Sequence, residues 1–284
     1  MSIVVTGATG QLGRHVVNQL LEKVPAEQIT AVVRDEAKAA DFGAKGVKIA
    51  VADYNTPETF DGLFAAGDKV LLISGNEFDK GRPAQHQVVI DAAKAAGVAL
   101  LAYTSAPGSL KATLVDDHRA TEKALLASGL PYALLRNGWY HENYTENLAP
   151  VLEHNAVVAA AGEGRVSSAS RADYAAAAVA VLTGEGHENQ TYELGGDTAW
   201  SFAEYAALIA EQTGKEIVYN SVPGEVLQGI LTGAGVPEFF AGILVGVDES
   251  IAKGELVVDS GDLSRLAGRP TTPLSESLAA ALKG

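Results

Sequence analysis

The 284-residue chain contains no cysteine, and this absence removes several kinds of chemistry at once. Disulfide bonds, thiolate nucleophiles and zinc–thiolate sites are all excluded. Positive charge is also scarce, because 21 lysine and arginine residues stand against 35 aspartate and glutamate residues, a formal net charge of −14. Nucleic acid and anionic membranes would be repelled by this charge, so we expect neither as a partner.

Long apolar segments are missing too. No apolar run approaches the ~20 residues that are needed to span a bilayer. Gly7, Gly10 and Gly13 interrupt the apolar N-terminal segment before it could act as a secretion signal, so we expect a cytoplasmic protein. The apolar fraction of 47% is nevertheless ample for one large core, or for a core with a smaller lobe.

Short apolar segments alternate with helical ones through the first half of the chain. Strands of this kind, separated by helices, pair in parallel with both sheet faces covered, and right-handed crossovers then give a doubly wound sheet. The sequence therefore predicts an α/β protein with a Rossmann-type doubly wound parallel sheet. The expected strands are residues 2–6, 28–33, 47–51, 69–73, 99–104 and 132–136, and the expected helices are residues 11–23, 36–42, 57–65, 83–96 and 116–128.

A glycine-rich loop, Thr6-Gly-Ala-Thr-Gly-Gln-Leu-Gly13, follows the first expected strand and opens the first expected helix. Glycine allows the positive φ of a tight turn and the close approach of phosphate oxygens. The helix N-terminus adds unpaired N–H groups and a partial positive charge. Because the strand, the helix and the later βα units agree, the loop predicts a pyrophosphate site rather than an ordinary glycine-rich turn.

The residue after the second strand indicates which dinucleotide binds. Sites selective for NAD place a carboxylate there to hold the ribose 2′-hydroxyl, but this strand ends in Arg34. A guanidinium suits a 2′-phosphate through bidentate pairing, so NADPH/NADP+ is the expected cofactor. Asp35 could partly cancel this charge, and Arg34 could instead be a solvated surface residue.

Polar residues at the ends of later strands are expected to border the rest of the cofactor, because ligands bind beyond the carboxyl ends of parallel strands. Asp53 is placed to contact the adenine amine, or else to cap a turn. Ser74-Gly75-Asn76 should border the adenosine and its ribose. Tyr103-Thr104-Ser105 should lie near the nicotinamide.

The alternation loosens after Asn137. The segments beyond it are mostly helical, although a short strand at 191–194 predicts that the chain returns to the main sheet near Tyr192. We expect an NADP-binding Rossmann domain over residues 1–136. Residues 137–284 are expected to form mostly a smaller, mainly helical substrate lobe. The helices expected there span residues 172–182, 202–213, 225–233, 238–253, 260–266 and 275–282.

Several motifs together resemble one protein family. The glycine spacing is that of extended and atypical short-chain dehydrogenases/reductases, and further matching segments are Leu71-Leu-Ile-Ser74, Ala102-Tyr-Thr-Ser105, Leu135-Arg-Asn-Gly-Trp-Tyr-His-Glu-Asn143 and Ser170-Arg-Ala-Asp-Tyr174. With them the chain resembles the NmrA-like atypical short-chain reductases. Within that family it is most similar to the branch of bacterial type 2 NADPH:quinone oxidoreductases and triphenylmethane reductases, almost from end to end.

The resemblance implies a set of residues that border NADPH. Residue chemistry supports part of this set, since Trp139 and Tyr140 can stack on a nicotinamide or an aromatic acceptor, and Asn143 can hydrogen-bond a carboxamide or a quinone oxygen. Core packing of these residues, and a turn role for Arg165, are the alternatives. The implied set is Gly7, Ala8, Thr9, Gly10, Gln11, Leu12, Arg34, Ser74, Gly75, Asn76, Gly138, Trp139, Tyr140, Asn143 and Arg165.

The catalytic pair of most short-chain reductases is absent. They use Tyr-x-x-x-Lys, in which lysine lowers the pKa of the tyrosine, but no tyrosine here has a lysine four residues later. The expected helix carries His118 and Glu122 at i,i+4 instead, which predicts either a proton donor with its orienting carboxylate or a surface ion pair. The candidate catalytic residues are therefore Tyr140, Asn143 and His118.

An enzyme without that pair suits hydride acceptors that need little acid catalysis, because a conjugated system delocalises the incoming electron pair. The leading prediction is an NADPH-dependent oxidoreductase that transfers hydride to quinones or to similar conjugated acceptors such as triarylmethane dyes. A non-enzymatic NADP(H)-sensing regulator and an atypical carbonyl reductase are the alternatives. We expect a small aromatic or quinone substrate, neither a metal nor a flavin, and a monomer or homodimer.

Overall fold

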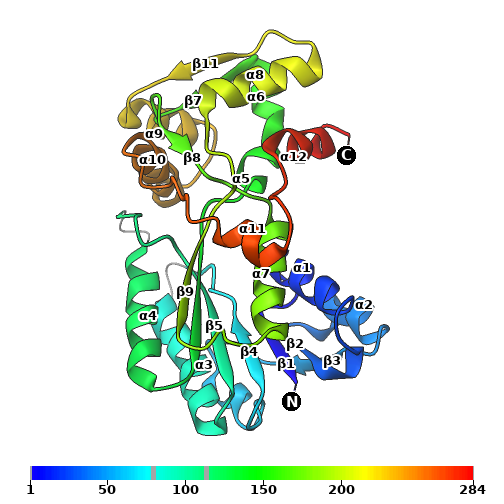
Figure 1. The fold of residues 1–284 in the computed structure, drawn as a ribbon. Helices are drawn as coiled ribbons and strands as arrows, with labels where there is room; N and C mark the ends of the chain where they lie inside the picture. Colours follow the sequence, from blue (N-terminus) through cyan, green and yellow to red (C-terminus); the bar gives the residue numbers. More distant parts are fainter. Residues whose placement is uncertain (1, 78–80, 112–114, 284) are drawn as a thin grey trace.

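A computed structural model describes residues 2–77, 81–111 and 115–283 of the chain. A twisted sheet with helices on both faces forms the larger part, and a mostly helical lobe sits at one end of it (Figure 1). The sheet has seven strands, all parallel, in the order β3-β2-β1-β4-β5-β6-β9. Its strands are β1 (Ile3–Thr6), β2 (Ile29–Val33), β3 (Lys48–Val51), β4 (Lys69–Leu72), β5 (Leu100–Ser105), β6 (Tyr132–Asn137) and β9 (Gln190–Leu194).

Each face of the sheet buries its own set of side chains. Ile3 and Val5 of β1 pack with one pair of helices, and Val4 between them points to the other pair, as the two-residue period of a strand requires. The first pair is α1 (Gln11–Leu20) and α7 (Arg171–Thr183), and the second is α3 (Arg82–Ala96) and α4 (Asp116–Ser128). The predicted doubly wound sheet is confirmed.

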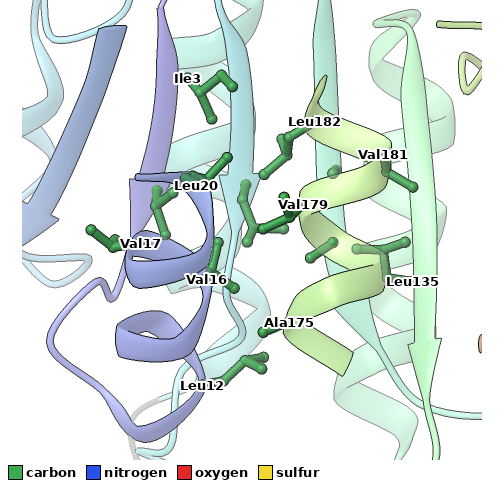
Figure 2. Packing of buried hydrophobic residues seen from close by; sticks show 14 of the residues in the cluster. Ile3, Leu12, Val16, Val17, Leu20, Leu135, Ala175, Val179, Val181 and Leu182 are labelled. Atoms are coloured by element: carbon green, nitrogen blue, oxygen red, sulfur yellow. The ribbon is translucent and has the colours of Figure 1, made fainter. Parts of the chain in front are cut away.

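Helices α1 and α7 lie side by side on the first face (Figure 2). The alanine-rich sequence of α7 leaves little bulk between the two helices, so that Val179 and Leu182 contact the same cluster as Val16 and Leu20 of α1. All four side chains are 3% exposed or less. Burying a side chain of this size contributes about 1.5–3 kcal/mol. This packing fixes the N-terminus of α1, and with it the glycine-rich loop.

One predicted helix of the sheet part is wrong. Residues 57–65 form only the 3₁₀ helix η3 (Pro57–Phe60), because Asp61 is extended and Gly62 has a φ of +69°, which an α-helix cannot accept. The predicted helix at 36–42 is split into the 3₁₀ helix η2 (Glu36–Ala39) and the single turn α2 (Ala40–Gly43). Helix α4, by contrast, spans the predicted residues and ends at Gly129, whose φ is +76°.

The smaller lobe is built around an apolar cluster of its own that includes Trp200, Phe202 and Ile251. Two short two-stranded sheets pair β7 with β11 in parallel and β8 with β10 antiparallel. The elements of the lobe are α5 (Glu142–Thr145), α6 (Leu148–His154), β7 (Ala156–Ala159), β8 (Arg165–Val166), β10 (Trp200–Ser201), α8 (Phe202–Thr213), β11 (Val218–Ser221), α9 (Gly224–Gly233), α10 (Glu238–Ala252) and α12 (Leu274–Ala281).

The chain passes between the two parts more than once. It leaves the sheet after β6, returns with α7 and β9, and returns again with α11 (Asp262–Ala267), which packs on α7 and β9. The return near Tyr192 is thus present as β9. The division of the chain at residue 137 stays a prediction. None of the described helices is long and apolar enough to cross a membrane.

Candidate active site

The glycine-rich loop forms a cradle at the carboxyl end of β1. Gly7 has a φ of +62°, and Gly10 precedes α1 as its N-cap. No described side chain caps the helix, so the first amides of α1 remain available to an anion. A Cβ atom on Gly13 would lie 2.3 Å from the carbonyl oxygen of Gly7, so only glycine lets the helix approach the turn this closely. These features fit a bound pyrophosphate.

A cleft of about 640 Å³ runs from this loop, along the carboxyl ends of the strands, to the smaller lobe. Four basic and two acidic side chains line its described wall, so the cleft is locally positive in a chain with a net charge of −14. That balance suits an anionic cofactor. The predicted site residues that line the cleft are Gly7, Thr9, Gly10, Gln11, Leu12, Arg34, Asp53, Ser74, Gly75, Asn76, Thr104, Ser105, His118, Gly138, Trp139, Tyr140 and Asn143.

Three predicted cofactor contacts lie outside the described lining of the cleft. Ala8 is fully buried, and its N–H donates to the carbonyl oxygen of Val32 at 3.2 Å rather than toward the cleft. Tyr103 is also fully buried. Arg165 lies on β8, where its guanidinium pairs with Glu204 at 2.7 Å and donates to a backbone carbonyl. The expectation that these three side chains border the cofactor is corrected accordingly.

At the adenosine end, Arg34 is already engaged by the protein. Its Nη1 lies 2.9 Å from Oε1 of Glu77. Asp53 accepts the backbone N–H of Asn55 at 2.9 Å, so it caps a turn, as one of its two predicted roles requires, while still lining the cleft. The sequence did not predict Glu77, Asn55 and Gln85, which meet here. Asn55 follows β3, Glu77 follows β4 and Gln85 lies on α3, so no spacing in the sequence links them.

The predicted pairing of His118 with Glu122 is wrong. Nε2 of His118 accepts a hydrogen bond from Arg82 at 3.0 Å, and Nδ1 lies 2.8 Å from the hydroxyl of Tyr103. Burial and the neighbouring Arg82 guanidinium lower the pKa of His118 to about 3, so its imidazole is neutral near pH 7. A neutral ring that accepts at Nε2 carries its proton on Nδ1 and donates it to Tyr103.

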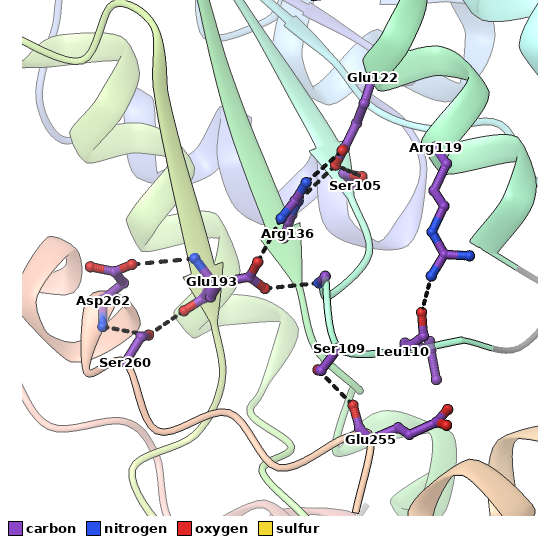
Figure 3. A network of polar contacts seen from close by, with 11 residues as sticks. Ser105, Ser109, Leu110, Arg119, Glu122, Arg136, Glu193, Glu255, Ser260 and Asp262 are labelled. Atoms are coloured by element: carbon purple, nitrogen blue, oxygen red, sulfur yellow. Dashed lines mark hydrogen bonds and ion pairs between the residues drawn. The ribbon is translucent and has the colours of Figure 1, made fainter.

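Glu122 belongs to a separate network (Figure 3). It accepts two hydrogen bonds from Arg136, at 2.9 and 2.7 Å, and a third from the hydroxyl of Ser105 at 2.6 Å. Arg136 also pairs with Glu193 of β9 at 2.7 Å. These hydrogen bonds, first those to Glu122, raise the pKa of Arg136. Glu122 is only 8% exposed, so the predicted surface ion pair is wrong as well.

This network holds the loop that follows β5. The N–H of Gly108 donates to Glu193 at 3.1 Å. The Ser109 hydroxyl donates to the carbonyl of Glu255 at 2.8 Å (Figure 3). The same loop supplies Pro107 and Leu110 to the wall of the cleft. The half-buried ion pair between Arg136 and Glu193 therefore helps to hold the loop that forms this apolar wall of the cleft.

The far end of the cleft is aromatic. The ring of Tyr140 meets that of Tyr174 edge to face at 5.2 Å, and the guanidinium of Arg171 lies 5.4 Å from its centroid. Burial raises the pKa of Tyr140. Trp139 packs against the core of the smaller lobe and also lines the cleft. No described residue accepts a hydrogen bond from the half-buried side-chain amide of Asn143, which leaves it available to a ligand.

Comparison with known proteins identifies the family. Residues 7–185 match the NAD(P)H-binding family. The chain belongs to this family. It is 45% identical over 278 residues to quinone oxidoreductase 2 of Escherichia coli (strain K12), and the match covers 97% of each protein.

Two solved structures of such family members share the whole fold. The Escherichia coli NADPH-dependent quinone oxidoreductase in complex with NADPH has a TM-score of 0.95 at 44% identity and covers 99% of both chains. The Citrobacter sp. triphenylmethane reductase in complex with NADP(H) has a TM-score of 0.94 at 43% identity and covers 99% of this chain and 100% of that one. The predicted fold, family resemblance and cofactor class are confirmed.

Proposed function

We propose that the chain is an NADPH-dependent oxidoreductase that transfers hydride to quinones or to similar conjugated acceptors such as triarylmethane dyes. The observation that carries the proposal is a single cleft that joins the phosphate cradle and Arg34 to an end lined by Trp139, Tyr140 and Asn143. The relatives named above, whose own names specify quinone and triphenylmethane substrates, support it.

The chain's own residues would hold NADPH along the cleft. The amides at the start of α1 face the pyrophosphate, Arg34 the 2′-phosphate, and Ser74-Gly75-Asn76 the adenosine. Thr104 and Gly138 then border the nicotinamide. A Cβ atom on Gly138 would lie 2.9 Å from the carbonyl oxygen of Leu194, so glycine keeps this wall close to the sheet. When bound, NADPH supplies the hydride.

The acceptor would rest between the aromatic end and the apolar wall. Trp139 and Tyr140 offer ring surfaces, and the Asn143 amide can donate a hydrogen bond to the oxygen on which negative charge develops. Pro107, Leu110 and other apolar side chains exclude water from the same space. A quinone that gains a hydride and then a proton from solvent becomes a hydroquinone, and the nicotinamide is oxidised by the same two electrons.

The decisive experiment measures anaerobic NADPH oxidation by the nicotinamide absorbance with a quinone, a triarylmethane dye and an aliphatic ketone. Turnover with the first two and little with the ketone would support direct hydride transfer to conjugated acceptors. Equal turnover with the ketone would favour the atypical carbonyl reductase. Tight NADPH binding without any turnover would favour the sensor, whose affinities for NADP+ and NADPH should then differ.

We further propose that the protein is cytoplasmic and acts as a monomer or homodimer, without a nucleic-acid or membrane partner. The net charge of −14 supports the absence of polyanionic partners. Cell fractionation and light scattering of the purified chain would test location and oligomeric state. Tyr140 and Asn143 are the proposed catalytic residues. His118 is a weaker candidate, because both of its ring nitrogens are engaged by the protein.

A further inference from the structure

The guanidinium expected to bind the 2′-phosphate already has an anionic partner. Oε1 of Glu77 lies 2.9 Å from Nη1 of Arg34, in a pair whose side chains are 22% and 60% exposed respectively. Both residues line the cleft. Arg34 follows β2 and Glu77 follows β4, and β1 lies between these strands in the sheet. The ion pair therefore joins two loops on either side of the loop that cradles the pyrophosphate.

The other carboxylate oxygen of Glu77 has separate partners. Oε2 accepts from Nδ2 of Asn55 at 3.0 Å and from Nε2 of Gln85 at 3.2 Å. Gln85 also donates to Oδ1 of Asn55 at 2.9 Å, so the two amides support each other. The contacts on Oε2 do not depend on the contact of Oε1 with Arg34. The carboxylate can thus lose Arg34 and still keep two hydrogen bonds, which lowers the cost of separation.

From this arrangement we infer that Glu77 is a specificity-determining residue that competes with the 2′-phosphate of NADPH for Arg34. The inference rests on the proposed NADPH site. A phosphate can pair with the guanidinium bidentately, whereas the half-buried Glu77 contacts Arg34 through one oxygen only, so NADPH displaces Glu77 from Arg34. NADH carries a hydroxyl at that position and leaves the ion pair in place. Glu77 therefore weakens NADPH binding selectively and narrows the preference for NADPH over NADH.

The test uses small probes of the adenosine end alone. Adenosine 2′,5′-bisphosphate and 5′-AMP differ only in the 2′-phosphate, and calorimetry gives the Kd of each for the full chain. For Glu77→Gln we expect the bisphosphate to bind about two- to fivefold more tightly, the range that an exposed ion pair contributes. The Kd of 5′-AMP should stay unchanged, so the ratio of the two affinities should rise by the same factor.

Two comparisons separate this competition from a general change in charge. Glu204→Gln removes the same charge from an exposed arginine pair outside the described lining of the cleft and should leave the ratio unchanged. In an Arg34→Ala background, Glu77→Gln should no longer change the ratio, because the competed group is gone. A ratio that rises equally in that background, or that rises in Glu204→Gln, would overturn the inference.

Failure of the inference can be told from failure of the proposed site. If the wild-type chain prefers the bisphosphate and Glu77→Gln leaves that preference unchanged, the competition is refuted while the NADPH site stands. If the wild-type chain does not prefer the bisphosphate over 5′-AMP at all, the assignment of Arg34 is refuted, and the competition with it.

Discussion

Acid should destabilise this protein through its buried histidines, whose pKa values are lowered, and His86 is the one that can be tested most directly. His86 on α3 is fully buried, and its Nε2 accepts the backbone N–H of Gly75 at 3.0 Å while Nδ1 lies 2.8 Å from the hydroxyl of Thr121. Burial and the Arg82 guanidinium lower the pKa of His86 from 6.5 to about 3. Protonation would also turn Nε2 into a donor facing a donor. The unfolded chain therefore binds the proton more readily than the folded one.

The size of this effect follows from linkage. A folded pKa below the unfolded value makes the free energy of unfolding fall as the pH drops below 6.5, and the loss is complete only below about pH 3. At about pH 5, roughly 1.5 units below the unfolded pKa, protonation of this histidine stabilises the unfolded state relative to the folded one by roughly 2 kcal/mol. Typical domains have about 5–15 kcal/mol of stability, so the loss is measurable.

The assay is urea unfolding at about pH 7.5 and about pH 5, with His86→Gln compared against wild type. The comparison is needed because burial raises the pKa of Asp248 to about 6, and that group gains stability as the pH falls. The variant should lose less stability than wild type on acidification, by roughly 2 kcal/mol. His15→Gln, at an exposed position, should follow wild type and serves as the matched control.

An identical loss of stability in wild type and His86→Gln would refute the reasoning. A direct readout guards against a variant that does not fold. In the wild-type protein, the NMR signals of the His86 ring should show no titration between about pH 5 and 8, because a group with a pKa near 3 stays neutral there. A titration near the ordinary histidine pKa would also refute it.

Three substitutions in the cleft test the proposed roles. Arg34→Ala removes a charge-assisted contact of about 1.5–3 kcal/mol but also an ion pair of about 0.2–1 kcal/mol, so kcat/KM for NADPH should fall about two- to hundredfold while that for NADH is unchanged. Equal losses with both cofactors would contradict this. Asn143→Ala should lower kcat with a quinone by about tenfold or more, and an unchanged kcat would leave the residue a structural role. His118→Ala should lower kcat by much less than the roughly hundredfold loss expected for a general acid, and the pH profile should not change. A loss of about hundredfold or more would make His118 catalytic.

Local signals predicted most of the fold. Helix α4 could be predicted over its observed residues because both of its ends carry local signals. Its first turn is acidic, and it ends at Gly129, which adopts a φ of +76°. The helix predicted at 57–65 fails for an equally local reason, the positive φ of Gly62, but a glycine in a helical pattern does not by itself reveal its φ. The short strand β7 could not be predicted from local sequence, because it pairs with β11, about 60 residues later in the sequence.

The candidate site was predictable where short continuous segments of the sequence supply its lining residues. Most of the glycine-rich loop lines the cleft as expected, and so do Arg34, Gly138, Trp139, Tyr140 and Asn143. The i,i+4 spacing placed His118 and Glu122 on one helix face, but their partners are side chains of α3, β5 and β6, which local spacing does not reveal. Glu77 could not be found at all, since its partners Arg34, Asn55 and Gln85 come from three other segments that only the folded sheet brings together.

The same partners limit what chemistry the acceptor end can perform. Burial raises the pKa values of Tyr103 and Tyr140, and a phenol with a raised pKa gives up its proton less readily than a free one. The imidazole of His118 has a pKa near 3 and is unprotonated near pH 7. All three groups are weaker acids than a tyrosine activated by a lysine, so they protonate a developing alkoxide less readily, and that protonation is the step that an aliphatic ketone requires. A quinone spreads the same charge over its conjugated ring and can take its proton from water afterwards. The loss of the Tyr–Lys pair therefore narrows the useful acceptors to those whose reduced anions are already stable.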